Sequence, residues 1–558
     1  MRPIVVEEIS LENFQSIFER TTFPIKPITF LFGPNSAGKS AIFDLLKFLD
    51  AFFHKNGNEF IRCVNEYWHH GSTATTKPEM TVGIKFKLRD EPYNSTKISI
   101  DPRAGAYSLP VEFAKIPSFL NWAKENGGRI EVFLKIQRPP FSHVKVSLKV
   151  SLNGHTIINL SQDNQENYKL TFCGTPFEES FIGMCKRHGA ETIGSEFEVQ
   201  CEFNLQTLAI YGQNNIADEK YIFHKEIISL ANYVIDGLTS IKFEPYLVDG
   251  SRGVIASNEL RSFVSSQAWY SGGPMDEQFG PASVDIASGW PRSLNFGIPV
   301  DIIEKFAAKD VSKFIEFLAI SGFARSISSR LDKMYPNKWH GVICGDTLFQ
   351  SRSEYLHEII NRWLSDNLFT AENTRSYQLA FSVSETSVPG QESVSTTEYP
   401  HQNAAIVFIY LLDQQGRPTV FEEVGSGVSC ILPVLVASLS GCGFIQQPEL
   451  HLHPALQSGL GDVFIEATKI TDGNLIIETH SEYALLRCLK RIRQTHHGQP
   501  PLSDEIRLSN TDIAVLYFDP QVNGSTKIKR LNITPEGDFV ERWPRGFFEE
   551  RGRELFDE

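Results

Sequence analysis

The chain has 558 residues, of which 41% are apolar and 22% charged, close to the usual globular mixture. This composition excludes a wholly disordered, collagen-like or coiled-coil chain, and the length allows several hydrophobic cores. The formal net charge of −14 speaks against the overall basic surface of a protein that coats nucleic acid, but it does not bear on a local basic groove.

Cysteine usage and hydropathy predict a compartment. The eight cysteines include no C-x-x-C pair, a pattern typical of reduced intracellular thiols rather than of a disulfide framework or a zinc site. Glu7 and Glu8 stand where a secretory signal needs its apolar segment. The most apolar stretch, 430–445, contains Pro433 and falls short of a membrane span. We therefore expect a cytoplasmic protein without a membrane partner.

A glycine-rich motif lies between two apolar segments near the N-terminus. Residues 28–32 form a short apolar run that predicts a buried strand. Apolar residues recur at helical spacing from Ile42 to Phe53, and Gly57 is the expected end of that helix. The residues between strand and helix match G-x-x-x-x-G-K-[ST]: Gly33, Pro34, Asn35, Ser36, Ala37, Gly38, Lys39 and Ser40.

This order of strand, glycine loop and helix predicts a nucleotide site. Backbone N–H groups and the helix N-terminus offer donors and positive potential to phosphates. Lys39 would supply a positive charge to the β- and γ-phosphates of ATP, and the Ser40 hydroxyl would ligate Mg²⁺. An ordinary glycine turn before a helix is the alternative, and the flanking pattern disfavours it.

A second group of motifs follows about 400 residues later. Gly425, Ser426 and Gly427 precede an apolar stretch, 431–439, that is suitable for a buried helix. The three residues would leave N–H groups at its start for an anion, although for this motif alone a plain flexible turn is the favoured interpretation. Beyond them the sequence predicts a helix from Pro454 to about Thr468, then a strand from Asn474 that ends in a polar turn, and a helix from Tyr483.

The segments LFGPNSAGKS, EEVGSGVSCILPVL, QQPELHLHPALQ and IIETHSEYALLR occur in this order. With them the chain resembles ABC-type ATPases of the SMC/RecF/OLD group, and within that group the PtuA family of ATPase subunits from Septu anti-phage systems, which also occur with some retrons. Residues 9–16 and 537–548 are similar to the first strand and the tail of these relatives. The resemblance covers about 1–90 and 400–558. It implies an α/β fold, namely an ABC-type P-loop ATPase head.

The resemblance also implies roles for individual residues. Gly33 to Ser40 would hold the triphosphate and Mg²⁺. Gly425, Ser426 and Gly427 would form the signature turn, which in such proteins contacts the γ-phosphate bound to the other subunit. His480 would be the switch histidine that senses this phosphate. Gln446 and Gln447 occupy the place of the paired acids that follow the Walker B strand, so Gln446 would share the metal site with Ser40.

The two glutamines depart from the family pattern. Glutamine can hydrogen-bond water, but it cannot accept a proton from water as a carboxylate does. Gln447 is found in related defence ATPases, whereas Gln446 is either a divergence of this chain or a substitution that traps nucleotide. Glu449 is near enough to compensate in part, but the favoured interpretation is that it caps the turn that follows it. The resemblance therefore implies an ATPase with slow or absent hydrolysis, in which ATP acts as a clamp.

The domain prediction has three parts. Residues 1–90 and 401–558 would form the N- and C-terminal parts of the ATPase head, and residues 91–400 a long inserted mixed β/helical region. The insertion is expected to be β-rich to about 225, loop-rich at 250–297 and helical at 300–334 and 353–364, with a polar stretch at 383–399 before the head resumes. No long heptad array predicts a coiled-coil arm.

Three functions are compared. The resemblance favours a regulatory ATPase subunit that forms a homodimer or higher oligomer around ATP and controls an HNH nuclease supplied in trans, in retron versions together with a reverse transcriptase and its DNA–RNA product. The alternatives are a RecF-like repair ATPase that binds DNA directly and a non-hydrolysing, nucleotide-gated scaffold. Basic residues Arg487, Lys490, Arg491 and Arg493 could meet phosphates, but a solvated helix face is the favoured interpretation.

Overall fold

The computed structural model divides the chain into two compact units. Unit 1 comprises Met1, Tyr246–Asp512 and Ile533–Phe539, and unit 2 comprises Arg2–Pro245, Ile513–Asn532 and Val540–Glu558. The structure describes residues 4–54, 57–68, 79–89, 118–137, 144–162, 168–172, 197–205, 208–212, 218–239, 241, 246–248, 294–297, 359–364, 377–386, 404–413, 415–419, 427, 431, 434–435, 438–439, 442–498 and 504–544.

A nine-stranded antiparallel sheet dominates unit 2, in the order β10-β9-β8-β7-β6-β5-β4-β1-β2. Its strands are β1 (Ile4–Glu12), β2 (Thr21–Pro24), β4 (Glu79–Leu88), β5 (Arg129–Gln137), β6 (Lys145–Leu152), β7 (His155–Gln162), β8 (Tyr168–Phe172), β9 (Phe197–Asn204) and β10 (Ala209–Gly212). Burial alternates along β5, where Ile130, Val132 and Leu134 are fully buried, as the period of a strand with one covered face requires. The prediction of a β-rich segment up to about residue 225 is confirmed for the described residues.

The N- and C-terminal parts of the chain meet in a parallel strand pair of unit 2. Strand β3 (Ile28–Phe32), which is buried throughout as the sequence predicts, pairs with β18 (Ile513–Pro520), so that Phe32 lies opposite Tyr517. Strand β19 (Thr526–Leu531) returns antiparallel to β18. Both faces of β3 are covered, which explains its uninterrupted apolar run.

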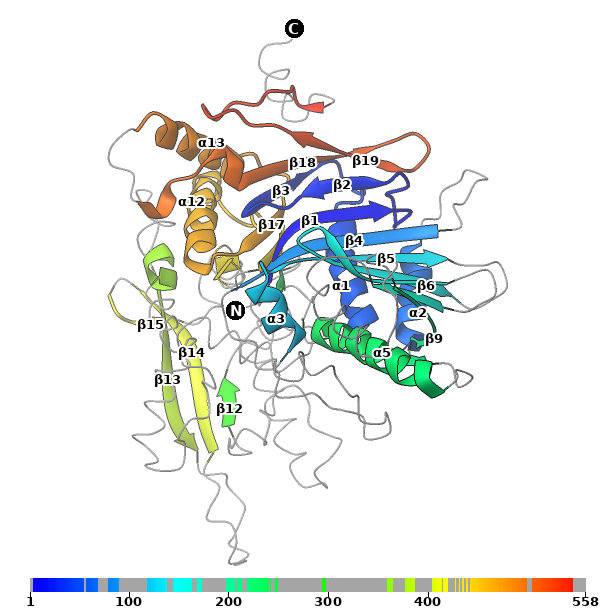
Figure 1. Ribbon diagram of the computed structural model, residues 1–558. Helices are drawn as coiled ribbons and strands as arrows, with labels where there is room; N and C mark the ends of the chain where they lie inside the picture. Colours follow the sequence, from blue (N-terminus) through cyan, green and yellow to red (C-terminus); the bar gives the residue numbers. More distant parts are fainter. Residues whose placement is uncertain are drawn as a thin grey trace, which may run out of the picture. The chain divides into compact units, whose positions relative to one another are not determined.

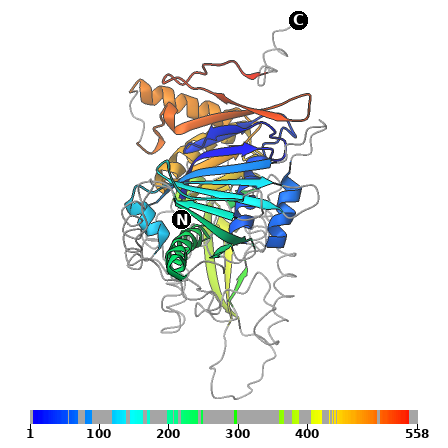
Figure 2. The same cartoon turned by 45° about the vertical axis from the view of Figure 1, so that its right-hand side comes forward.

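The described part of unit 2 contains the helices α1 (Ala41–His54), α2 (Gly57–Tyr67), α3 (Phe119–Glu125) and α5 (Asp218–Thr239). Helices α1, α2 and α5 lie on the same side of strands β4–β6 in both views (Figures 1 and 2). Gly57 begins α2 instead of serving as the stop of α1, which already ends at His54. Phe60 of α2 reaches back to Phe48 and Phe52 of α1, with ring centroids 5.3 and 5.1 Å apart, so the two helices share one aromatic core.

Unit 1 contains three neighbouring parallel strands, β11 (Tyr246–Val248), β16 (Cys442–Gln446) and β17 (Asn474–Glu478). Helix α12 (Pro454–Thr471) links β16 to β17, and α13 (Tyr483–His496) follows β17. Two short 3₁₀ turns, η5 (Asp504–Ile506) and η6 (Asn510–Asp512), come next. The predicted helix from Pro454, the strand from Asn474 and the helix from Tyr483 are all confirmed.

A smaller sheet of unit 1 has the order β12-β14-β13, with β15 also paired to β14. Its strands are β12 (Leu294–Gly297), β13 (Gln378–Thr386), β14 (Ala404–Leu412) and β15 (Pro418–Thr419). Residues 294–297 are therefore a strand inside the segment predicted as loops, and residues 383–386 end β13 inside the predicted polar stretch. Residues 359–364 are helical as predicted, whereas 300–334 lie outside the described residues.

These elements confirm the α/β fold class of a P-loop ATPase head that is built from N- and C-terminal parts of the chain and interrupted by a long inserted region. No helix of the described part of the chain is both long and apolar enough to cross a membrane.

Candidate nucleotide site

The loop between β3 and α1 has a strained, compact backbone. Gly33, Ser36 and Gly38 adopt φ values of 146°, 61° and 83°, all in the left-handed region. The Ala37 amide donates to the carbonyl of Pro34 at 3.2 Å, which closes the turn. Asn35, Ser36 and Ser40 are exposed, whereas Ala37 is buried. The exposed edge of the loop and Ser40 therefore face outward, whereas the first residues of α1, Ala41 to Phe43, are buried.

Two of the glycines are required because atoms of Phe518 and Ser16 come close. A Cβ atom at Gly33 would lie 2.6 Å from the carbonyl oxygen of Phe518 on β18. A Cβ atom at Gly38 would lie 1.9 Å from the hydroxyl oxygen of Ser16. Real Cβ atoms do not approach so closely, and both positions also need a positive φ. The two glycines are therefore needed for packing within unit 2, apart from any role in binding a ligand.

The back of the loop is braced by β19. Thr526 donates its hydroxyl hydrogen to the carbonyl of Ala37 at 2.8 Å, and its amide donates to the carbonyl of Ser16 at 2.7 Å. On the other side, Gln15 donates from Nε2 to Asp44 Oδ2 of α1 at 2.7 Å. These contacts fix the loop from both ends of the chain. The sequence analysis did not identify Thr526 or Gln15, because no local motif marks them.

Lys39 folds over the start of the loop. Its ammonium donates to the carbonyl of Gly33 at 3.1 Å and to that of Pro34 at 3.0 Å, and the residue is 4% exposed. Two carbonyl groups of the loop thus hold the charged amine against the loop. The loop therefore concentrates positive charge and N–H dipoles, the combination that binds phosphate.

The predicted signature turn is only partly described. Gly425 and Ser426 lie outside the described residues, and Gly427 is helical. A Cβ atom at Gly427 would lie 3.0 Å from the carbonyl oxygen of His451. Beyond it, Ile431, Val434, Leu435 and Leu439 are helical and at most 1% exposed, which confirms the predicted buried helix at those positions.

Gln446 and Gln447 lie at the carboxyl end of β16. Gln446 is opposite Glu478, the last residue of β17, and its Nε2 donates to Glu478 Oε2 at 3.3 Å. The Gln447 amide donates to the Glu478 carbonyl at 2.6 Å, and Gln447 has a positive φ of 47°. Ligands of open parallel sheets bind at this end of the strands. Glu478 is a carboxylate that the sequence analysis missed, because only strand pairing brings it beside Gln446.

His480 lies in the polar turn after β17, and Glu449 holds this turn. Glu449 accepts hydrogen bonds from the His480 amide at 2.9 Å and from the Thr479 hydroxyl at 2.8 Å. The expectation that Glu449 caps its own following turn is therefore corrected: its carboxylate braces a turn 31 residues further along the chain. Backbone donors there need an acceptor since the turn ends a strand.

Gln457, on the first turns of α12, completes this polar network. It accepts from the Ser481 hydroxyl at 2.6 Å and donates to the Leu452 carbonyl at 2.9 Å. Ser481 also accepts from the Tyr483 amide at the start of α13, at 3.2 Å. The loop after β16, the start of α12 and the turn after β17 thus form one hydrogen-bonded assembly that fixes the backbone of His480.

The two predicted magnesium ligands belong to different units, Ser40 to unit 2 and Gln446 to unit 1. Mg²⁺ prefers hard oxygen ligands and is usually bound by one or two carboxylates plus substrate phosphates. Ser40 offers an exposed hydroxyl, and Gln446, whose amide nitrogen donates to Glu478, presents an amide oxygen. Both are oxygen donors of the right type, but both are neutral. Among the described residues, no group of three or more His, Cys, Asp and Glu could hold a metal ion by itself.

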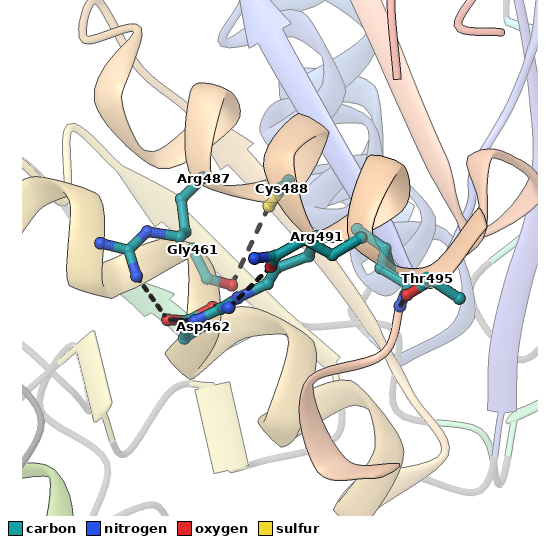
Figure 3. A network of polar contacts seen from close by, with 8 residues as sticks. Gly461, Asp462, Arg487, Cys488, Arg491 and Thr495 are labelled. Carbon is teal, nitrogen blue, oxygen red and sulfur yellow. Dashed lines mark hydrogen bonds and ion pairs between the residues drawn. The ribbon is translucent and has the colours of Figure 1, made fainter. Parts of the chain in front are cut away.

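The basic residues of α13 have protein partners. Arg491 binds both oxygens of Asp462 at 2.7 Å, and Arg487 binds Oδ2 at 3.0 Å (Figure 3). The hydrogen bond between Arg491 and Asp462 raises the pKa of the Arg491 guanidinium. Burial raises the pKa of the neighbouring Cys488 thiol. Arg493 binds Asp538 at 2.8 Å. Arg487 and Arg491 are therefore partly buried in unit 1, which contradicts the solvated face favoured for them, whereas Lys490 and Arg493 are exposed as that interpretation requires.

Two family models match the sequence. Residues 5–237 match one described as "AAA ATPase domain", and residues 320–487 match one described as "AAA domain, putative AbiEii toxin, Type IV TA system". The first match contains the loop at 33–40, and the second contains Gln446, Gln447 and His480. They support an ATPase of the AAA kind. No curated protein gives a significant match.

Solved structures of SMC heads are similar at low identity. One is an Smc head bound to the C-winged helix domain of ScpA (12% identity, 95% of this chain and 98% of that chain, TM-score 0.36). The second, from Pyrococcus furiosus, is an Smc head with an extended coiled coil bound to the C-terminal domain of ScpA (12%, 95% and 96%, TM-score 0.35). The third is the SMC head from Thermotoga maritima (11%, 96% and 100%, TM-score 0.34). Because these TM-scores lie below 0.5, the likeness establishes neither a shared function nor a shared partner.

Proposed function

We propose that this protein is an ATP-binding, ABC-type regulatory ATPase of the SMC/RecF/OLD group. The observation that carries the proposal is the loop 33–40, set between a buried strand and a helix, with Lys39 folded onto its carbonyls. Lys39 would move from these carbonyls to the phosphates of ATP, and the N–H groups from Gly33 to Ser40 would surround them. Ser40 would contribute its hydroxyl to Mg²⁺, whose role is to neutralise phosphate charge.

Hydrolysis is proposed to be slow. Gln446 and Gln447 can orient water through hydrogen bonds, but neither can take its proton. His480, with its backbone fixed by Glu449, would report on the γ-phosphate. Gly425, Ser426 and Gly427 would act on the nucleotide of a second copy of the chain, so that ATP favours a closed homodimer or higher oligomer.

The biological role is proposed to be anti-phage defence. The resemblance to Septu and retron ATPases, together with the AbiEii-type description of residues 320–487, supports it. In this role the protein would be cytoplasmic and would control an HNH nuclease in trans, in retron versions together with a reverse transcriptase and its DNA–RNA product. The head would be formed by residues 1–90 and 401–558, and the insertion at 91–400 would carry partner contacts.

ATP binding tests the first proposal. Isothermal titration calorimetry of the full chain with ATP and Mg²⁺ should give a saturable site, and Lys39→Ala should weaken it about 10- to 100-fold, since a charge-assisted contact contributes about 1.5–3 kcal/mol. Lys47→Ala is the matched control, because Lys47 lies on α1, beyond the loop, and its side chain is 47% exposed. No binding by the native chain, or equal loss in both variants, would contradict a nucleotide site at this loop.

Native mass spectrometry of the chain purified from its own host tests the biological role. A dimer or higher oligomer that carries ATP and a small nuclease is the expected result. A nucleotide-free monomer without a partner would contradict the defence assignment. A chain that carries only DNA would favour the RecF-like repair ATPase.

A further inference from the structure

Glu478 lies beside the two glutamines that replace the expected acids. It is the last residue of β17, at the carboxyl end of a parallel strand, and it lies directly opposite Gln446 on β16. Its carboxylate accepts from Gln446 Nε2 at 3.3 Å, and its carbonyl accepts from the Gln447 amide at 2.6 Å. Glu478 is thus linked to both glutamines that replace the paired acids.

The charges at these strand ends are unequally distributed. Gln446 and Gln447 are neutral at any pH, and Glu449 accepts hydrogen bonds at both carboxylate oxygens, from Thr479 and from His480. Glu478 is half-buried rather than enclosed. Within the described residues of unit 1, its carboxylate is hydrogen-bonded to the predicted metal residue Gln446.

We propose that Glu478 supplies the carboxylate of the divalent-cation site, in place of the acid missing at position 446. The inference rests on the proposed ATPase function and assigns a further metal-site residue to it. Gln446 uses its amide nitrogen in the hydrogen bond to Glu478, so its amide oxygen is the atom that would serve a cation. One carboxylate and one amide oxygen are ligand types that suit Mg²⁺.

The role of a metal-site carboxylate can be separated from that of a structural residue by thermodynamic coupling. Divalent cation and nucleotide strengthen each other's binding by one common factor, which is the ratio of ATP affinities with and without the metal. Loss of a metal-site carboxylate lowers this ratio. It leaves metal-free ATP binding unchanged or slightly tighter, because one negative charge near the phosphates is removed.

The experiment measures ATP binding to the full chain by calorimetry in EDTA and in MnCl₂, with Mn²⁺ as the probe. Glu478→Gln should reduce the ratio of the two affinities by about tenfold or more, the effect usual for a residue that supports a metal ligand. Asp472→Asn is the matched control. It removes the same charge at an exposed residue before the amino end of β17, where φ is 49° and asparagine is tolerated.

Glu478→Asp keeps the carboxylate on a shorter side chain and should recover part of the lost ratio, which protects the test if Glu478→Gln folds poorly. An unchanged ratio in Glu478→Gln, with ATP binding intact, would overturn the assignment of Glu478 and leave the ATPase proposal standing. If the native chain binds no ATP in either buffer, the ATPase proposal itself fails.

Discussion

Thr526 donates a hydrogen bond to the carbonyl oxygen of Ala37 at 2.8 Å and thereby ties the phosphate loop to a strand that lies 489 residues further along the chain. The same residue binds the Ser16 carbonyl through its amide. Since Thr526 and Ala37 are both buried, 5% and 1% exposed, water does not replace this bond when it is lost.

Thr526→Val removes the hydroxyl but keeps the shape of the side chain. The Ala37 carbonyl would lose its donor, and we expect the free energy of unfolding to fall by about 1–3 kcal/mol. ATP affinity should fall too, because the loop loses its brace. Thermal unfolding with and without ATP measures both effects. Thr534→Val, in the surface turn before Gly537, is the control, and an equal response of the two variants would contradict the special role of Thr526.

Gln446→Glu should raise turnover by about 10- to 100-fold, the range in which residues that support a metal site affect activity, because a carboxylate binds a divalent cation more strongly than a neutral amide does. The measurement is steady-state phosphate release in Mg²⁺. Gln415→Glu makes the same change in the exposed turn between β14 and β15 and should have no effect. Unchanged turnover in Gln446→Glu would show that the amide at 446 does not limit hydrolysis.

Asp462→Asn should destabilise the packing of α12 against α13. Its carboxylate accepts hydrogen bonds from Arg487 and from Nε and Nη2 of Arg491, at 2.7–3.0 Å. All three side chains are between 15% and 29% exposed. We expect a loss of about 1–2 kcal/mol in urea unfolding, because charge-assisted hydrogen bonds are replaced by weaker ones. Asp538→Asn, whose carboxylate is 66% exposed beside Arg493, should cost less than about 0.5 kcal/mol. Equal losses would contradict this ranking.

His54 should make stability depend on pH. Burial alone would lower its pKa, but the hydrogen bond and charge of Asp50, with the carbonyls of Thr239 and Asp50, raise the pKa above 6.5. The folded state therefore binds a proton more tightly than the unfolded chain. The contribution is fully present below pH 6.5 and is lost as the pH rises through the raised value.

His54→Gln tests this pH dependence. The variant should be less stable than the native chain below pH 6.5, and the difference should shrink at alkaline pH. Melting temperatures across this range measure it, with His155→Gln at the exposed start of β7 as the control for loss of an imidazole. If the native chain and His54→Gln differ in melting temperature by the same amount at every pH, the charge of the His54 imidazole has no role in stability.

Local patterns predicted the strands and helices that position the site. The run 28–32, the helices from Ala41, Pro454 and Tyr483, and the strand from Asn474 follow from the periodicity and capping of contiguous residues. The end of α1 was misplaced, because a glycine that starts one helix looks in sequence like the stop of another.

The contacts that complete the site could not be predicted in this way. Glu478 reaches Gln446 only through strand register, and Glu449 binds the turn at His480 across 31 residues. Thr526 meets Ala37 from the other end of the chain. Each of these depends on tertiary pairing, for which spacing along the sequence carries no signal.

The pairing of β3 with β18 also sets an order of events during synthesis. Strand β3 leaves the ribosome hundreds of residues before β18, yet its parallel partner and the Thr526 brace arrive only with the C-terminal segment. Contacts of such long sequence separation form late. A nascent or truncated chain would thus carry the glycine motif without its brace, and tight nucleotide binding would mark only chains whose translation has passed β19.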